Sequence, residues 1–250
     1  MSPEDDALTA RVRAPSVDAS LGMKLLPTVL SMTAGSVDVI SFLGLGGLFT
    51  AHITGNLVIL ASRIVTGGEA PFAPMLSVPV FMVALGLTRL LVGGLESIGV
   101  ASLRPLLLLQ LLLLAGFFVL CVAAGPRIDP NTATAILGGM LGVSAMAVQN
   151  ALVQVSLKGA PSTAVMTTNV TRFMMDLGEV LLGRNPDDVA KARRRANHTW
   201  PAIVGFAVGC GLGAAGEAAF ELWSLALPIG LALLALAIGL AAGLDSGQQL

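Results

Sequence analysis

One carboxylate stands deep inside an apolar stretch near the start of the chain. Asp38 lies within the run Ser36–Ile40, among residues typical of a membrane helix. A charge at membrane depth costs about 3 kcal/mol on insertion scales, so Asp38 needs a partner or a water-filled cavity. Such a carboxylate could bind a cation or exchange a proton during transport. The alternative is an interhelical hydrogen bond or ion pair that only fixes the packing.

A second candidate is a sequence pattern that occurs twice. T-A-x-x-T-x-N begins at Thr50 and again at Thr163, 113 positions apart. The later polar members of the two copies are Thr54 with Asn56 and Thr167 with Asn169. Thr and Asn near a helix start are good N-caps, which is the simpler interpretation. If these helices begin inside the membrane, their N-termini could instead bind an anionic group.

Each copy is preceded by a predicted helix that carries a polar residue. Asp38 lies 16 positions before Thr54, and Asn150, which follows Gln149, lies 17 positions before Thr167. Uncharged amides hydrogen-bond across membrane helices, so a structural role is expected for Gln149 and Asn150, with lining of a pathway as the alternative. The spacing predicts two related halves, and transporters built this way form their sites between the halves. Duplication of a helical hairpin without transport is the alternative.

Other charged residues also fall in or near apolar segments. Arg89 could reach Asp38 if their two helices touch. Arg172 and Asp176 are four positions apart, so they are expected to neutralise each other within one helix.

The composition decides the class of protein that must position these residues. The 250 residues are 55% hydrophobic and only 12% charged, with a mean hydropathy of +0.85 and a net charge of −1. These values exclude a nucleic-acid binder that uses a basic surface, a disordered chain and a typical soluble enzyme. They indicate an all-α, polytopic transmembrane helical bundle whose first partner is the lipid bilayer.

Eight apolar stretches approach the roughly 20 residues that a helix needs to cross a bilayer. They are Lys24–Leu48, Thr50–Thr66, Pro74–Leu95, Pro105–Ala124, Thr132–Leu157, Ser162–Leu182, Trp200–Phe220 and Leu222–Leu244. The second and the sixth are short or polar. The predicted organisation is a disordered cytoplasmic tail at 1–22, a first membrane half at 23–125 and a second half at 126–244, with a basic cytoplasmic loop at 183–199.

Basic residues predict the orientation, because cytoplasmic loops are enriched in Lys and Arg. Ten basic residues fall on the cytoplasmic side and two on the other, whether all eight segments cross or the second and sixth do not. Both termini are therefore expected in the cytoplasm. The number of crossings, six or eight, stays open, and so does a homo-oligomer.

Several kinds of chemistry lack the residues they need. The chain has no ATP-binding P-loop, and its two His residues, His52 and His198, form no ligand cluster with Cys or carboxylates. No cofactor and no metal are therefore expected. No pairing of a nucleophile with a base is evident, so an enzyme is not expected.

The residues around Asp38 and the two T-x-N copies resemble the YoaK family of small bacterial membrane proteins. The matching stretches are Ala34–Asp38, Phe42–Phe49, Thr54–Leu57, Met146–Ala151 and Thr167–Asn169. The resemblance implies a multi-pass protein of the bacterial inner membrane with about six transmembrane segments and no established substrate. Members of that family usually carry T-G-N in the second copy, whereas this chain has Thr168 in place of the Gly.

The polar residues within the apolar segments and the repeated pattern together predict a small-solute transporter or permease. Transport coupled to protons is one mechanism that it could use. The residues expected to line the substrate or ion pathway are Asp38, Thr54, Asn56, Arg89, Gln149, Asn150, Thr167 and Asn169. The alternative is a membrane scaffold or interaction protein that transports nothing.

Overall fold

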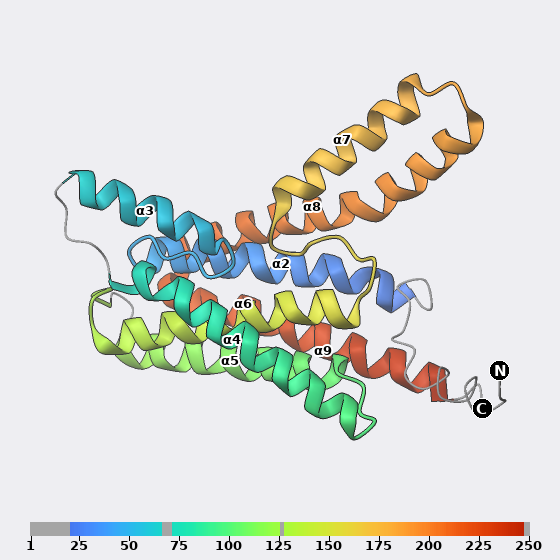
Figure 1. Ribbon diagram of the computed structural model, residues 1–250. Coiled ribbons are helices and arrows are strands. Elements are labelled where there is room, and N and C mark those ends of the chain that lie inside the picture. The colour runs from blue at the N-terminus through green and yellow to red at the C-terminus, as the bar shows by residue number, and fades with distance from the viewer. Residues whose placement is uncertain (1–20, 67–71, 126–127, 248–250) are drawn as a thin grey trace.

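The computed structural model describes residues 21–66, 72–125 and 128–247, and every regular element in these ranges is helical (Figure 1). The elements are α2 Leu21–Gly44, α3 Ile53–Thr66, α4 Phe72–Ser97, α5 Leu103–Ala124, α6 Ala133–Ser156, α7 Met166–Leu182, α8 Pro186–Phe220, η1 Glu221–Leu225 and α9 Ala226–Gly247. The predicted all-α membrane bundle is confirmed. The predicted tail at 1–22 lies outside the described residues, except for its last two positions, which begin α2.

Most of these helices are suited to crossing a bilayer. Within the described ranges, five stretches are long and apolar enough: Lys24–Gly44, Phe72–Ser97, Leu103–Ala124, Ala133–Ser156 and Pro186–Ala242. The last stretch contains α8 and α9, which run in opposite directions and are joined by η1 (Figure 1). α2 begins and α9 ends at the same end of the bundle (Figure 1). The chain is a multi-pass membrane protein.

α3 and α7 are shorter than the apolar helices that could cross the bilayer. At 1.5 Å per residue, the 14 residues of α3 and the 17 of α7 extend about 21 and 26 Å, less than the ~30 Å hydrocarbon core. Both begin near the middle of the bundle and run toward opposite ends of it (Figure 1). This arrangement favours six crossings over eight, with α3 and α7 as half-helices.

α2 and α6 form the centre, and each is flanked by helices from the other part of the chain. α2 packs mainly on α8 and α9, whereas α6 packs mainly on α4 and α5. α3 lies along α4 and α7 lies along α8, while α5 and α9 contact each other. If the helices α2, α3, α4 and α5 are exchanged in order with α6, α7, α8 and α9, these contacting helix pairs map onto one another.

The contact between α2 and α8 depends on small residues spaced by four. A Cβ atom added to Gly205 would lie 2.7 Å from the carbonyl oxygen of Thr28, and one added to Gly213 would lie 2.9 Å from that of Ser36. At Gly209, between them, an added Cβ would overlap the backbone of Met32. The missing side chains let the two backbones approach closely, as small-xxx-small stretches do in membranes.

The segment predicted as a basic loop at 183–199 is helical from Pro186 onward, which corrects the prediction. Asn185 caps the helix, because its side chain accepts a hydrogen bond from the Asp187 N–H at 3.0 Å. Pro186 opens the first turn and two Asp residues follow, and both features favour a helix N-terminus. The predicted segment Trp200–Phe220 is therefore the second part of α8, whose first part projects from the bundle together with α7 (Figure 1).

Candidate functional site

The Asp38 carboxylate binds the loop that leads from α2 into α3. Oδ1 accepts hydrogen bonds from the Thr50 N–H at 2.8 Å, the Ala51 N–H at 2.6 Å and the Thr50 hydroxyl at 3.1 Å. Oδ2 accepts one from the His52 N–H at 3.1 Å. The side chain is 4% exposed, so four donors replace the water that this charge would otherwise need.

The His52 ring supplies a further contact to the same carboxylate. Its Nδ1 lies 2.6 Å from Asp38 Oδ2, and its ring packs edge-on against Phe206 of α8, with centroids 5.5 Å apart. The imidazole is 38% exposed, whereas the carboxylate is almost fully enclosed. Through His52, the buried charge therefore meets a group that protons can reach.

Asn56 closes the same loop from the first turns of α3. Its Nδ2 donates to the Phe49 carbonyl at 2.7 Å and to the Ser77 hydroxyl of α4 at 2.8 Å. Its Oδ1 accepts from the Phe49 N–H at 2.9 Å. Asn56 is buried and fully paired. It clamps the loop and does not take the expected N-capping role, while Asp38 on the preceding helix binds the loop N–H groups of Thr50, Ala51 and His52.

Asn169 makes the matching contact at the start of α7, but only in part. Its Nδ2 donates to the Ser162 carbonyl at 2.6 Å, again seven residues upstream. Its Oδ1 is buried and has no donor among the described residues. The side chain of Val165, at the N-cap position of α7, makes no capping bond. The second loop is thus a less complete version of the first.

Gln149 joins three parts of the bundle. Its Oε1 accepts from Gln110 of α5 at 2.7 Å, and its Nε2 donates to the Leu30 carbonyl at 3.0 Å and to the Thr163 hydroxyl at 2.9 Å. The side chain is fully buried. These contacts are the interhelical hydrogen bonds expected of a structural amide. Asn150 instead donates to the Met146 carbonyl of its own helix at 2.9 Å.

A cavity of about 410 Å³ lies beside the second loop, between that loop, α7 and α8. Its charged and polar lining includes Asn169, Arg172, Asp176, Arg195 and His198. Two guanidinium groups face one carboxylate there, so the lining is cationic. A second cavity of about 230 Å³ lies on the α6 side of the loop and is lined by Asn150, Ser162 and Thr163.

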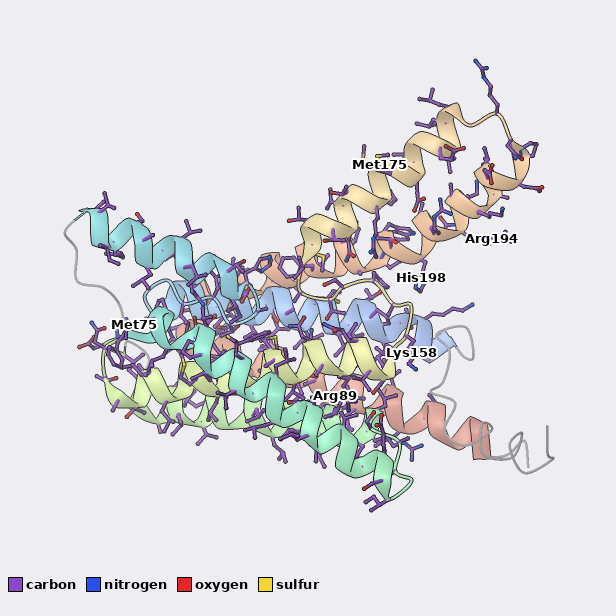
Figure 2. The ribbon with its side chains drawn as sticks, viewed as in Figure 1. Met75, Arg89, Lys158, Met175, Arg194 and His198 are labelled. Carbon is purple, nitrogen blue, oxygen red and sulfur yellow. The ribbon has the colours of Figure 1, made fainter. Side chains whose placement is uncertain are left out.

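Asp176 pairs across helices, which corrects the predicted pairing within α7. Its Oδ1 accepts from Arg195 of α8, with Nη2 at 2.6 Å and Nε at 2.8 Å. Arg172, the expected partner, is exposed on the cavity lining. His198 lies one turn beyond Arg195, close to the carbonyl of Gly159 at 3.2 Å. Figure 2 shows His198 on α8 near the point where the α7–α8 hairpin leaves the bundle.

The remaining predicted residues lie apart from this group. Arg89 is exposed on α4, and its ion-pair contact is with Glu96 at 4.0 Å (Figure 2). Thr54 and Thr167 are exposed on α3 and α7. Among the described residues, no group of His, Cys, Asp and Glu could hold a metal ion.

Arg195 and His198, which line the cavity, are not among the predicted site residues. Both fall in the segment predicted as a basic loop, because a polar stretch without apolar periodicity gives no sign that it packs on another helix. The Asn185-Pro186-Asp187-Asp188 start was the available signal.

Comparison with known proteins identifies the family. The family described as "Protein of unknown function (DUF1275)" matches residues 26–238, which is most of the chain, so the chain belongs to it. Over 39 residues the chain is 54% identical to the UPF0700 transmembrane protein YoaK of Bacillus subtilis (strain 168). That match covers 16% of this chain and 17% of YoaK. The resemblance noted from the sequence is thus confirmed, and no solved structure matches the chain.

Proposed function

We propose that this member of the DUF1275 family is a small-solute permease of the bacterial inner membrane. The observation that carries the proposal is the pair of half-helices, α3 and α7, which begin near mid-bundle and run to opposite ends (Figure 1). Transporters with inverted repeats place broken helices of this kind at the substrate site, with their N-termini pointing inward.

Two related halves of opposite orientation are part of the proposal. Asn56 and Asn169 each donate to the carbonyl oxygen seven residues upstream, at Phe49 and Ser162. The two contacts are 113 positions apart, like the sequence pattern itself. The helix pairs also correspond when α2–α5 and α6–α9 are exchanged.

The cationic cavity beside α7 is proposed as the cytoplasmic entrance. It lies toward the end of the bundle at which α2 begins and α9 ends (Figure 1, Figure 2). That end carries most of the basic residues of the chain, including Lys158 and the Arg193–Arg195 run, which favours the cytoplasm for it and for both termini.

Proton linkage is proposed for the Asp38–His52 pair. A proton taken up by the half-exposed imidazole converts its 2.6 Å contact with the carboxylate into an ion pair and strengthens the attachment of the first loop. The loop leads directly into α3, so the protonation state of His52 would bias the position of that half-helix.

A flux assay tests the function. The purified protein is reconstituted into liposomes, and uptake is followed for a panel of carboxylates, amino acids, amides, sugars and inorganic anions. We expect at least one solute to enter faster than in protein-free liposomes, and the Asn169→Ala variant to lose at least about tenfold of that flux because its loop is released. Asn131→Ala, which removes an exposed amide on the turn before α6, serves as the matched control and keeps the flux. The absence of uptake for every solute contradicts the proposal.

A second candidate function, a scaffold that transports nothing, is favoured by one observation. The carboxylate of Asp38 is enclosed by donors from its own chain, and Asp38 lines neither of the two cavities beside the second loop. The same flux panel separates the two functions.

A further inference from the structure

We infer that the loop before α7 binds a small carboxylate ligand, in the place that the Asp38 side chain fills in the loop before α3. This inference rests on the proposed transport function and names its substrate class. It is carried by a comparison of the two loops, one of which contains a carboxylate while the other lacks one.

The first loop shows what the T-A pair of the pattern can bind. The N–H groups of Thr50 and Ala51 and the Thr50 hydroxyl converge on one carboxylate oxygen, Asp38 Oδ1, at 2.6 to 3.1 Å. Successive N–H groups that point at one place form an anion-binding concavity. In this half, the anion is a side chain of the protein.

The second loop has the same donors and no carboxylate. Thr163 and Ala164 correspond to Thr50 and Ala51, 113 positions later. On the preceding helix, the corresponding positions hold Asn150 and Ala151, and the Asn150 amide turns back to the Met146 carbonyl. Among the described residues, the N–H groups of Thr163 and Ala164 have no acceptor.

One buried side chain at the second loop is also incompletely paired. Thr163 is 1% exposed, and its hydroxyl oxygen accepts from Gln149 while the hydroxyl proton has no acceptor in the described part of the chain. Buried donors in native proteins usually have acceptors, so this hydroxyl and the two N–H groups indicate a ligand that accepts hydrogen bonds. The unpaired Asn169 Oδ1 is itself an acceptor, so a carboxylate does not supply its partner.

The surroundings suit a small anion. Thr163, Ser162 and Asn150 line the 230 Å³ cavity, which is large enough for a molecule of a few heavy atoms. Gly159 and Ala160 line both this cavity and the cationic 410 Å³ cavity with Arg172 and Arg195. The guanidinium groups draw an anion toward the loop, and the N–H groups and hydroxyl then bind its carboxylate.

Binding to the purified protein in detergent tests the inference, with propionate and its uncharged analogue propionamide as probes in isothermal titration calorimetry. We expect propionate to bind at least about tenfold more tightly than propionamide, because donors bind a charged acceptor more strongly. Equal affinities, or no binding of propionate, overturn the inference.

Variants that give the second loop its own carboxylate provide the sharper test. Asn150→Asp and Ala151→Asp each add the missing group to α6, and we expect at least one of them to lose propionate binding by tenfold or more, with an unfolding temperature no lower than that of the wild type. Asn131→Asp, which adds the same charge on an exposed turn, is the matched control. Wild-type affinity in both α6 variants overturns the inference. So does wild-type affinity in Thr163→Val, whereas Thr163→Ser is expected to retain binding.

The outcomes separate this inference from the proposed function. If other solutes cross the membrane while propionate does not bind, the carboxylate site is wrong and the transport function stands. If propionate binds as expected but no solute crosses, the site stands and the transport function is wrong.

Discussion

Asp38 Oδ2 and His52 Nδ1 lie 2.6 Å apart, although 14 positions separate the two residues in the chain. The same carboxylate also accepts backbone N–H bonds from Thr50, Ala51 and His52. The charge on α2 thus holds the loop that leads into α3. Removal of the Asp38 carboxylate and removal of the His52 imidazole should therefore have different consequences.

The first prediction concerns the Asp38 charge. Asp38→Asn replaces one accepting oxygen with an NH₂ group that faces N–H donors, so the loop loses hydrogen bonds in a buried place. We expect destabilisation of about 3 kcal/mol, measured by thermal or denaturant unfolding in detergent. Glu96→Gln removes a carboxylate that is half-exposed and 4.0 Å from Arg89, and it should change stability by less than about 1 kcal/mol. Equal effects of the two substitutions would show that Asp38 does not hold the loop.

The second prediction concerns His52 and proton linkage. In the liposome assay, an imposed pH gradient should alter flux through the wild type, and His52→Gln should remove that response while flux without a gradient continues. Gln keeps a hydrogen-bond donor for Asp38 but does not take up a proton. His198→Gln, which alters the other His of the chain, is the control and should keep the gradient response. An unchanged response in His52→Gln would exclude this residue as the proton site.

The third prediction concerns the pairing of α7 with α8. Asp176 is buried and bonded to Arg195 through two nitrogens, so Asp176→Asn should loosen α7 and increase amide hydrogen exchange across Met166–Leu182. A double-mutant cycle of Asp176→Asn with Arg195→Gln should give a coupling of about 1 kcal/mol. The same cycle with Arg172→Gln should give almost none. A larger coupling to Arg172 would restore the pairing within one helix.

The fourth prediction concerns the close contact of α2 and α8. Gly209→Ala places a methyl group against the Met32 backbone, which cannot move aside as a side chain would. We expect a loss of about 1–3 kcal/mol in unfolding free energy. Gly211→Ala, on the same helix with open space at its Cβ position, should be neutral or slightly stabilising. If both variants unfold alike, the two helices are not in close contact at Gly209.

Part of the candidate site was open to prediction because it depends on residue types and their spacing. Asp38, Asn56, Gln149 and Asn169 are polar groups in apolar surroundings, and a polar group there must have a partner. The free-energy cost of an unpaired polar group in the membrane is enough to predict that each of them takes part in packing. The T-x-N copies also predicted that two loops of similar form would exist.

The partners themselves were beyond such prediction. Asp38 is bound mainly by backbone N–H groups, which every residue except proline carries, so no residue type marks them in a sequence. Arg195 lies 19 positions from Asp176 in the chain, whereas Arg172 lies four away. The packing of α7 on α8 brings the more distant residue to the Asp176 carboxylate. Arg89 was expected to reach Asp38 only if their two helices touch, and α4 instead packs mainly on α6.

The sequence by itself determined that the chain is a helical membrane protein, because burial of apolar surface in lipid depends on composition and segment length. It also determined which polar groups must be satisfied inside. The tertiary structure decided that α3 and α7 are half-helices running to opposite ends, that α8 extends through the expected loop, and that one loop holds a carboxylate while the other lacks one. These features depend on which backbones approach each other, and that depends on contacts between residues far apart in the chain.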